Sequence, residues 1–352
     1  MECMNILKTI LTGSSRRDGK PLDFAAIGDM TTDAFITLKD ASVNCDVDHH
    51  NCKLCVRFGD KVPYESVEVV RAVGNSANAA VSAARLGLTS TLISDAGVDE
   101  NGDECVKVLE AEGIVHTDFI RRHKGMITNY HYVLCYDAER TILIKHQNYP
   151  YALPEGMAAA APRWVYFSSV GEQSIPYHEE ITKWLQDNPE SKLAFQPGTF
   201  QLKLGTQKLA GLYARTEVFV CNLEESQLLL GMPDERDVKK LLAGIRAFGP
   251  KIVAITDGPK GAYVDDGTEQ LFVPQYPDPK PPVQRTGAGD AFASTFVSML
   301  ALGMSVRDAF LRAPISSMSV VQHVGAQKGL LTRDQIEEWL KKAPADYVVK
   351  NI

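Results

Sequence analysis

The sequence predicts an α/β fold with a mostly parallel central sheet, helices on both faces of that sheet, and a small β-sheet lid. Short apolar strands alternate with helices along the later chain, and this rhythm is typical of a parallel sheet covered on both faces. Two long strands of alternating polarity and an earlier polar insertion do not fit that rhythm. We expect these segments, at 128–136, 141–147 and 41–63, to form a one-sided sheet over the main domain.

The core elements follow one another in a regular order. A first strand is predicted at 24–27, and an alanine-rich helix at 76–86 ends at Gly87, a common C-terminal cap. Further strands are expected at 35–38, 67–70, 91–94, 164–167, 193–195, 218–221, 252–256 and 262–264, and further helices at 103–112, 177–187, 207–214, 237–248, 292–302, 306–323 and 333–342. We interpret residues 1–22 as a mobile N-terminal extension and 23–352 as one domain, with a lid formed by about 35–70 and 128–147.

The composition argues against several classes of protein. The 352 residues carry a formal net charge of -7 and show no basic stripe, which argues against a nucleic-acid partner. No apolar run reaches membrane-spanning length, so no membrane partner is expected. Seven cysteines, an odd number, do not resemble a disulfide framework in a long chain, and we expect a cytoplasmic protein.

The strongest functional signal is the turn Gly287-Ala288-Gly289, which directly precedes Asp290 and an apolar helix. At a helix N-terminus the backbone N–H groups are unpaired and the dipole favours anions, and small residues let a phosphate approach the backbone. Asp290 stands where a carboxylate can take a proton from a hydroxyl that attacks this phosphate. The arrangement indicates phosphoryl transfer to an alcohol, although Gly-x-Gly-Asp also occurs in ordinary turns and helix caps.

Two earlier segments offer side chains to a small polar ligand. Asp33 is placed just after the first strand, where a carboxylate can accept bonds from sugar hydroxyls or cap local N–H groups. Gly74 leads into the alanine-rich helix with Asn75 and Asn78, which lie one turn apart. A helix N-cap explains Asn75 equally well in isolation, but two asparagines on one turn favour a ligand.

Two later turns follow core strands. Asn222 and Glu225 suit a hydrated Mg²⁺ ion, which binds through few protein oxygens, but the same residues favour any helix start. The turn that contains Thr256, Gly258 and Gly261 can admit nucleotide phosphates or ribose, and a plain hairpin turn has the same composition.

The polar insertion contains a cluster of candidate metal ligands, namely Cys45, His49, His50, Cys52 and Cys55. Structural zinc sites usually show a second clean ligand pair, and that pair is missing here. We therefore interpret the cluster as part of a lid loop and expect no zinc.

In this order, the motifs resemble the ribokinase-like, or PfkB, family of carbohydrate kinases over about residues 24–342. The family's C-terminal signature matches 286–294, and its N-terminal signature matches 73–87. Its magnesium motif matches 222–225, and its nucleotide turn matches 256–261. The segment 325–327 resembles the family's turn beside the adenine site.

The resemblance implies an ATP- and Mg²⁺-dependent transfer of the γ-phosphoryl group to a primary hydroxyl of a sugar. Asp290 would be the general base, and the anion hole would be formed by Gly287, Ala288 and Gly289. The metal site would comprise Asn222 and Glu225. The acceptor would contact Asp33, Gly74, Asn75 and Asn78, and the nucleotide would contact Thr256, Gly258, Gly261, Gly289, Gly325 and Ala326. The lid often pairs with a second subunit in this family, which predicts a homodimer, with a monomer as the alternative.

The chain departs from the family pattern at two positions. The usual Gly-Gly pair before the sugar-site asparagine is Val73-Gly74, which leaves less room for close backbone approach. Many members carry an aspartate, linked to K⁺ activation, where this chain has Gln284, so potassium dependence is left open.

Two other functions compete with a sugar kinase. A nucleoside kinase would need an apolar slot for the base, for which the candidates are Phe35, Tyr130, Tyr132 and Phe167. A non-catalytic sugar-binding regulator would have no use for Asp290 and its anion hole.

Overall fold

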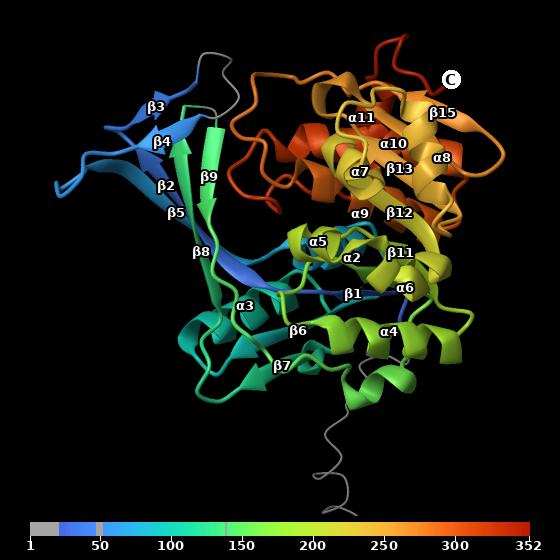
Figure 1. Cartoon of the computed structure of the whole chain (residues 1–352), viewed down its shortest axis with the longest axis horizontal. Coiled ribbons are helices and arrows are strands. Elements are labelled where there is room, and N and C mark those ends of the chain that lie inside the picture. Colours follow the sequence, from blue (N-terminus) through green and yellow to red (C-terminus); the bar gives the residue numbers. More distant parts are fainter. Residues whose placement is uncertain (1–20, 47–51, 138) are drawn as a thin grey trace, which may run out of the picture.

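The computed structural model describes residues 21–46, 52–137 and 139–352. Ten strands of this described part form the central sheet of the body, in the order β16-β15-β14-β13-β12-β11-β10-β1-β6-β7 (Figure 1). Neighbouring strands run parallel from β7 to β13, and the remaining pairs are antiparallel. The strands are β1 (Phe24–Ile27), β6 (Ser90–Gly97), β7 (Ile120–His123), β10 (Trp164–Phe167), β11 (Lys192–Phe195), β12 (Thr216–Asn222), β13 (Ile252–Thr256), β14 (Ala262–Asp265), β15 (Gln270–Val273) and β16 (Lys350–Asn351). The predicted mostly parallel sheet is therefore confirmed.

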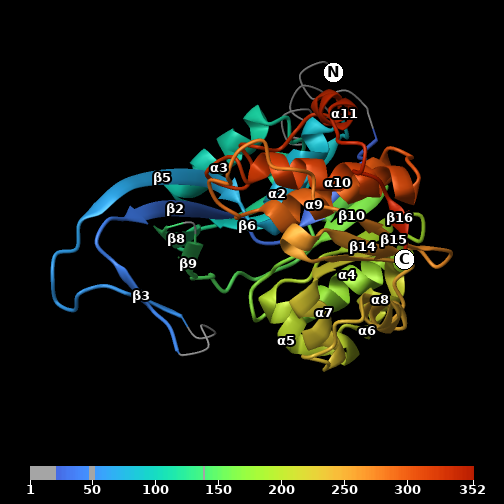
Figure 2. The same cartoon turned by 90° about the horizontal axis from the view of Figure 1, so that it is seen from above.

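Helices cover both faces of this sheet, as predicted (Figure 2). One face packs against α2 (Asn75–Arg85), α3 (Glu100–Ala111), α9 (Ala288–Ala301), α10 (Val306–Val320) and α11 (Arg333–Lys341). The other face carries α4 (Ile175–Asp187), α5 (Thr199–Lys208), α6 (Ala210–Arg215), α7 (Leu223–Leu230) and α8 (Val238–Arg246). None of the described helices has the length and hydropathy needed to cross a bilayer.

The alternation of side chains along each strand divides the apolar interior into two layers. In β1, Phe24 and Ala26 join the core beneath α2 and α9, whereas Ala25 and Ile27 join the core beneath α4 and α8. Both faces of the strands are thus apolar, which explains their continuous hydrophobic sequences. Each fully buried large apolar side chain contributes about 1.5–3 kcal/mol.

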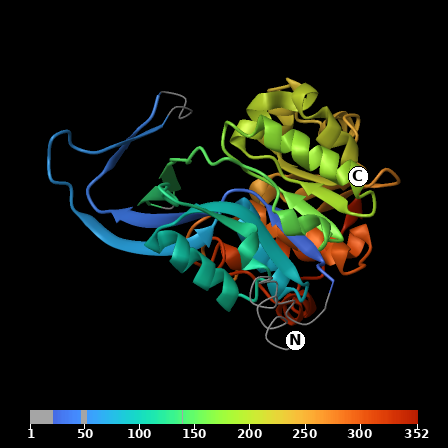
Figure 3. The same ribbon diagram turned by 90° about the horizontal axis from the view of Figure 1, so that it is seen from below.

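A second, smaller sheet forms the lid, with strand order β5 (Tyr64–Val73), β2 (Thr31–Leu38), β8 (Asn129–Tyr136) and β9 (Glu139–Leu143). In Figure 1 it stands to the left of the body. The short hairpin of β3 (Ser42–Asn44) and β4 (Lys53–Cys55) extends from it, away from the body (Figures 2 and 3).

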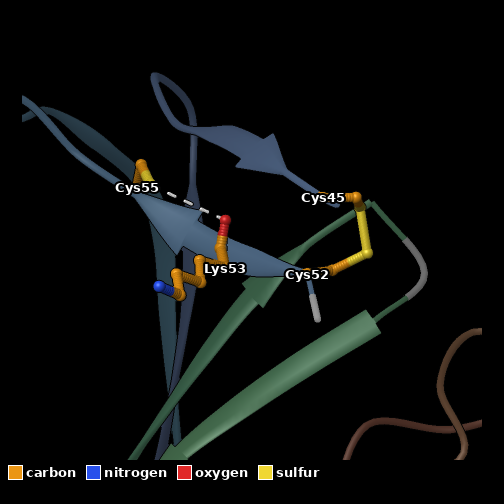
Figure 4. The surroundings of a disulfide bond; sticks show 4 residues. All are labelled: Cys45, Cys52, Lys53 and Cys55. Atoms are coloured by element: carbon orange, nitrogen blue, oxygen red, sulfur yellow. Dashed lines mark hydrogen bonds between the residues drawn. A yellow bond between two sulfur atoms is a disulfide. The ribbon is translucent and has the colours of Figure 1, made fainter. Parts of the chain in front are cut away.

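A disulfide joins Cys45 and Cys52 at the end of this hairpin (Figure 4). The two cysteines continue the β3–β4 ladder, because its last pair is Asn44 and Lys53. The odd cysteine count did not indicate this pair, and Cys55, Cys105, Cys135 and Cys221 are thiols. Two members of the candidate zinc cluster are therefore oxidised, and His49 and His50 lie outside the described residues.

Two expected elements and the expected place of Asp33 differ from the structure. The helix predicted at 207–214 is divided between α5, which already begins at Thr199, and α6, which begins at Ala210. The strand predicted at 141–147 ends at Leu143, and the chain then runs to β10 without regular strand structure. Asp33 does not end a core strand: it lies inside β2, opposite Val70 of β5 and His131 of β8.

Candidate active site

The carboxyl ends of the parallel strands lie at one edge of the central sheet, where ligands of such folds bind. Polar residues follow four of these strands: Asp29 after β1, Gln196 after β11, Asn222 at the end of β12 and Thr256 at the end of β13. All four line one cavity of about 720 Å³, which the lid strands also border. The order of strands in the sheet thus gathers side chains that are far apart in sequence.

The N-terminus of α9 points into the same cavity. Its N-cap, Gly287, has a φ of 80°, and a Cβ there would lie 2.3 Å from the Cβ of Ala326. Only glycine therefore fits this tight turn without strain. A Cβ on Gly289 would meet no atom within 4 Å, so this backbone is open to a ligand. Unpaired N–H groups of the first helical turn are available there for an anion.

Asp290 lies in this first turn and is held by three side-chain amides. Asn75 and Gln196 donate to its Oδ1 at 3.0 and 3.2 Å, and Asn78 donates to its Oδ2 at 2.9 Å. Burial raises the pKa of Asp290, whereas these three amides and the Arg140 guanidinium on lid strand β9 act to lower it. The carboxylate is thus fixed in place and more basic than an exposed aspartate.

Two of these amides are themselves oriented by neighbours. Tyr166 donates its hydroxyl proton to Oε1 of Gln196, which turns the amide N–H₂ toward Asp290. Gln327 donates to Oδ1 of Asn78 at 3.1 Å and to the carbonyl of Ala72 at 2.7 Å. Sequence reasoning missed Gln196 and Tyr166, although the position of Gln196 directly after a core strand is a usable signal.

The structure brings most of the predicted site residues together. The cavity that contains Asp290 is also lined by Asp33, Gly74, Asn75, Asn78, Asn222, Glu225, Gly287 and Ala326. A second cavity of about 270 Å³ is lined by Thr256, Gly258, Gly261, Ala288 and Gly289, together with Phe292, Pro314 and Met318. The two cavities share Thr256, Arg285 and Gly289. Gly325 lines neither cavity; it packs against Val70 of β5.

The magnesium candidates form a helix cap as well as a cavity wall. Asn222 Oδ1 accepts from the Glu225 N–H at 2.8 Å, and Glu225 Oε2 accepts from the Asn222 N–H at 2.9 Å. Burial raises the pKa of Glu225, and the charges of Asp290 and Glu224 raise it further. A divalent cation would offset this clustered negative charge, and the cap leaves one Glu225 oxygen for a metal-bound water. These residues fit a hydrated Mg²⁺ ion.

Comparison with known proteins gives a consistent result. The model of the pfkB family of carbohydrate kinases matches residues 41–333. The chain is 27% identical over 271 residues to the ribokinase of Bacillus subtilis, which covers 76% of this chain and 87% of that protein. Its fold resembles Arabidopsis thaliana ribokinase complexed with ribose and ATP, with a TM-score of 0.76 at 18% identity over 92% of this chain and 99% of that one. It also resembles the nucleoside kinase of Methanocaldococcus jannaschii, with a TM-score of 0.71 at 17% identity over 92% and 100%.

The architecture is that of the ribokinase fold. The chain belongs to the pfkB family of carbohydrate kinases, because the family model covers most of its length. It is accordingly a phosphotransferase that acts on an alcohol group.

Proposed function

We propose that this enzyme transfers the γ-phosphoryl group of ATP to a primary hydroxyl of a sugar, with Asp290 as the general base. The observation that carries the proposal is the position of Asp290 in the first turn of α9, next to the point where the two cavities meet. The smaller, more apolar cavity takes the nucleotide, and the larger one takes the acceptor and the transferred phosphoryl group. Residues 23–352 act in this proposal as one domain with a lid.

The proposed reaction uses groups that are already in place. Asp290 accepts the proton of the acceptor hydroxyl as that oxygen attacks the γ-phosphorus. The amides of Asn75, Asn78 and Gln196 keep the carboxylate oriented during this step. N–H groups of Gly287, Ala288 and Gly289 stabilise the charge that develops on the phosphoryl oxygens. Bound through Asn222, Glu225 and its own waters, Mg²⁺ would neutralise phosphate charge.

None of the four aromatic residues expected for a nucleoside base slot lines the acceptor cavity, which supports a sugar as the proposed acceptor. Of the candidates for a base slot, Phe167 is fully buried in the core, and Phe35 lines a separate cavity under the lid. Tyr130 and Tyr132 do not line the acceptor cavity either. Its wall carries polar side chains near the lid, among them Asp29, Asp33, His131, His146 and Asn148, which suit a polyhydroxylated molecule, beside the apolar Ile142, Ile144 and Phe200.

The test is a coupled ADP-release assay over pentoses, hexoses, sugar acids, sugar phosphates and nucleosides. We expect a sugar to give the highest kcat/KM and Mg²⁺ to be required. Nucleosides as the best acceptors would replace the sugar assignment, and the absence of acceptor-dependent ADP release would refute the proposed function.

The lid also supports a proposed homodimer. The strand register places Val69, Ala34, Tyr132 and Leu143 side by side in one row across the sheet. Asp33 and His131, the neighbours of Ala34 and Tyr132, line the acceptor cavity, so this row lies on the opposite face. Val69, Tyr132 and Leu143 are 38, 49 and 51% exposed, which leaves apolar surface for a second subunit. Light scattering measures the molar mass in solution. We expect a dimer for the wild type and a monomer for Tyr132→Glu, because the substitution places a charge in this apolar row.

Two further parts of the proposal concern conditions. We propose that the enzyme acts in the cytoplasm, where ATP is available. Disulfides are rare in that compartment, so the Cys45–Cys52 bridge is the one feature that opposes this location. Differential alkylation of cell extracts would measure the fraction of Cys45 and Cys52 that is oxidised, and complete oxidation in cells would contradict a cytoplasmic location.

The position linked to potassium activation is occupied by a side chain that already has a partner. Oε1 of Gln284 accepts from Thr286 Oγ1 at 3.0 Å, so we propose turnover without potassium. Equal rates in sodium and potassium salts are expected.

A further inference from the structure

A buried aspartate at the edge of the acceptor cavity organises two aromatic side chains that the proposed reaction does not use. Asp29 follows β1 and is 5% exposed. Its Oδ2 lies 2.8 Å from Nδ1 of His146, and the Tyr151 hydroxyl donates to Oδ1 at 2.9 Å and to Oδ2 at 3.1 Å. Asp29 and His146 line the cavity that contains Asp290, 261 positions away from Asp29 in sequence. The three residues therefore form a built cluster within the acceptor site.

Tyr151 is firmly held and can only donate to Asp29. Its ring stacks on Tyr177 with centroids 5.5 Å apart, and its oxygen accepts from the Gly171 N–H at 3.0 Å. Burial, followed by the charge of Asp29, raises the pKa of Tyr151 well above its usual range. The hydroxyl stays protonated, so the tyrosine fixes the orientation of the carboxylate.

The carboxylate in turn fixes His146. In the described part of the chain no lysine or arginine forms an ion pair with Asp29, and His146 is the basic side chain that lies beside it. The Nδ1–H of His146 donates to Asp29 in the neutral tautomer and in the imidazolium alike. The ring lies between His131 and Phe200, with centroid distances of 5.3 and 5.8 Å, which restrict its rotation. Nε2, for which the described residues provide no partner, remains for a molecule in the cavity.

The two histidines of this region differ in what they can offer. The side chain of His131 is 11% exposed, its Nδ1 lies 3.4 Å from Asp33, and its Nε2 is buried without a partner. His146 is more exposed, at 17% of its side chain, and lines the cavity with its second nitrogen unused. His146 is thus the better placed of the two to contact an acceptor.

We propose that His146 binds an oxygen of the acceptor through Nε2, and that Asp29 and Tyr151 position it to do so. The acceptor class is a polyhydroxylated sugar with a hydroxyl or carbonyl oxygen beyond the one that is phosphorylated. The inference rests on the proposed function. It assigns acceptor selection to the junction between the lid and the body, separate from the chemistry at Asp290.

The first test compares variants with the best acceptor of the ADP-release screen. His146→Gln should raise the KM for the acceptor about 10- to 100-fold, the range of a charge-assisted hydrogen bond, while the KM for ATP changes less than about twofold. Asp29→Asn should raise it less, because Nε2 is retained but misoriented. His123→Gln is the matched control: His123 also pairs with a buried aspartate, Asp95, at 2.6 Å, but lines neither the acceptor nor the nucleotide cavity. An unchanged acceptor KM in His146→Gln would overturn the proposal.

The positioning role of Asp29 has its own readout. Asp29→Asn should raise the acceptor KM without lowering kcat, because the amide no longer fixes the Nδ1–H of His146 while Asp290 keeps its three amide partners. Equal acceptor KM values in wild type and Asp29→Asn would leave Asp29 with no positioning role.

The acceptor oxygen that His146 contacts can be identified by comparing wild type and His146→Gln on deoxy analogues of the acceptor, each of which lacks one oxygen. Wild type should lose about 10- to 100-fold in kcat/KM on the analogue that lacks the oxygen bound by His146. His146→Gln should lose less than about threefold on the same analogue, and equal losses in both proteins on every analogue would refute the contact. Thermal-shift titration with the sugars separates this outcome from a failure of the proposed function. Stabilisation of wild type but not of His146→Gln supports the site even without turnover, and equal stabilisation overturns it.

Discussion

The body and the lid of this kinase are built in different ways. Strands of the body are apolar on both faces and bury alternate residues in two separate cores. Strands of the lid are apolar on the outer face and carry both polar and apolar side chains on the face toward the cavity, and several of their side chains remain exposed. The proposed phosphoryl-transfer groups lie on the body, whereas Asp33, His131 and Arg140 come from the lid. The more buried part therefore carries the proposed chemistry, and the less buried part faces the proposed acceptor.

The largest expected effect is at the body. Asp290→Asn keeps the size of the side chain but removes the proton acceptor, and loss of a general base typically lowers the rate about 10²–10⁴-fold. Turnover is measured by ADP release and nucleotide binding by calorimetry. Near-normal turnover would remove Asp290 as the base, whereas lost ATP binding would show a structural defect.

The anion hole should be nearly as sensitive. Gly287→Ala places a Cβ 2.3 Å from that of Ala326 at a positive φ, so the turn must shift and displace its N–H donors. Loss of one such donor costs about 10²–10³-fold in kcat. Gly303→Ala is the control, because Gly303 also has a positive φ, of 89°, with nothing near the added Cβ. Equal kcat values in the two variants would mean that the Gly287 turn does not form the anion hole.

On the lid side, Asp33→Ala should act on the acceptor. Loss of a charged hydrogen bond to a hydroxyl costs roughly 1.5–3 kcal/mol, which is about a 10- to 150-fold rise in the acceptor KM. The KM for ATP should change little, because Asp33 does not line the nucleotide cavity. If only the KM for ATP changed, the assignment of Asp33 to the acceptor would be wrong.

The pH dependence of kcat separates the two regions further. Burial raises the pKa of Asp290 above its usual 3.8, and a base must be deprotonated to work. The rate should therefore rise with pH through that raised pKa and fall at acid pH before an ordinary aspartate would protonate. Burial also raises the pKa of Glu225, so the variant Glu225→Gln tests which of the two carboxyl groups causes the fall of kcat at acid pH. A fall of kcat only near the pKa of an exposed aspartate would contradict the assignment of the buried Asp290 as the base.

The same contrast explains what the sequence could predict. Body strands have continuous apolar runs, and the Gly-Ala-Gly-Asp turn has a local physical signature, so both were found from the sequence alone. Asp33 was assigned to the wrong element because β2 follows β1 after three residues with no clear break in pattern. Gln196, Asp29, His146 and Tyr151 come together only through strand order and lid packing, which no local pattern contains. The disulfide escaped notice because an odd cysteine count in a long chain does not indicate a single bridge.

The smallest effect should come from the tip of the lid. Replacing Cys45 and Cys52 by serine removes a bridge whose hairpin, β3 and β4, is largely exposed and pairs only with itself. The central cores contain no residue of this hairpin, so the melting temperature of the body should shift by no more than about 1 °C, less than 1 kcal/mol would produce in a chain of this length. Amide exchange in the β3–β4 segment should nevertheless increase, because that hairpin loses its covalent closure. A large fall in melting temperature would show that lid and body unfold as one unit, and the division between them would have to be abandoned. Unchanged exchange at the tip would mean that the strand pairing alone holds the hairpin.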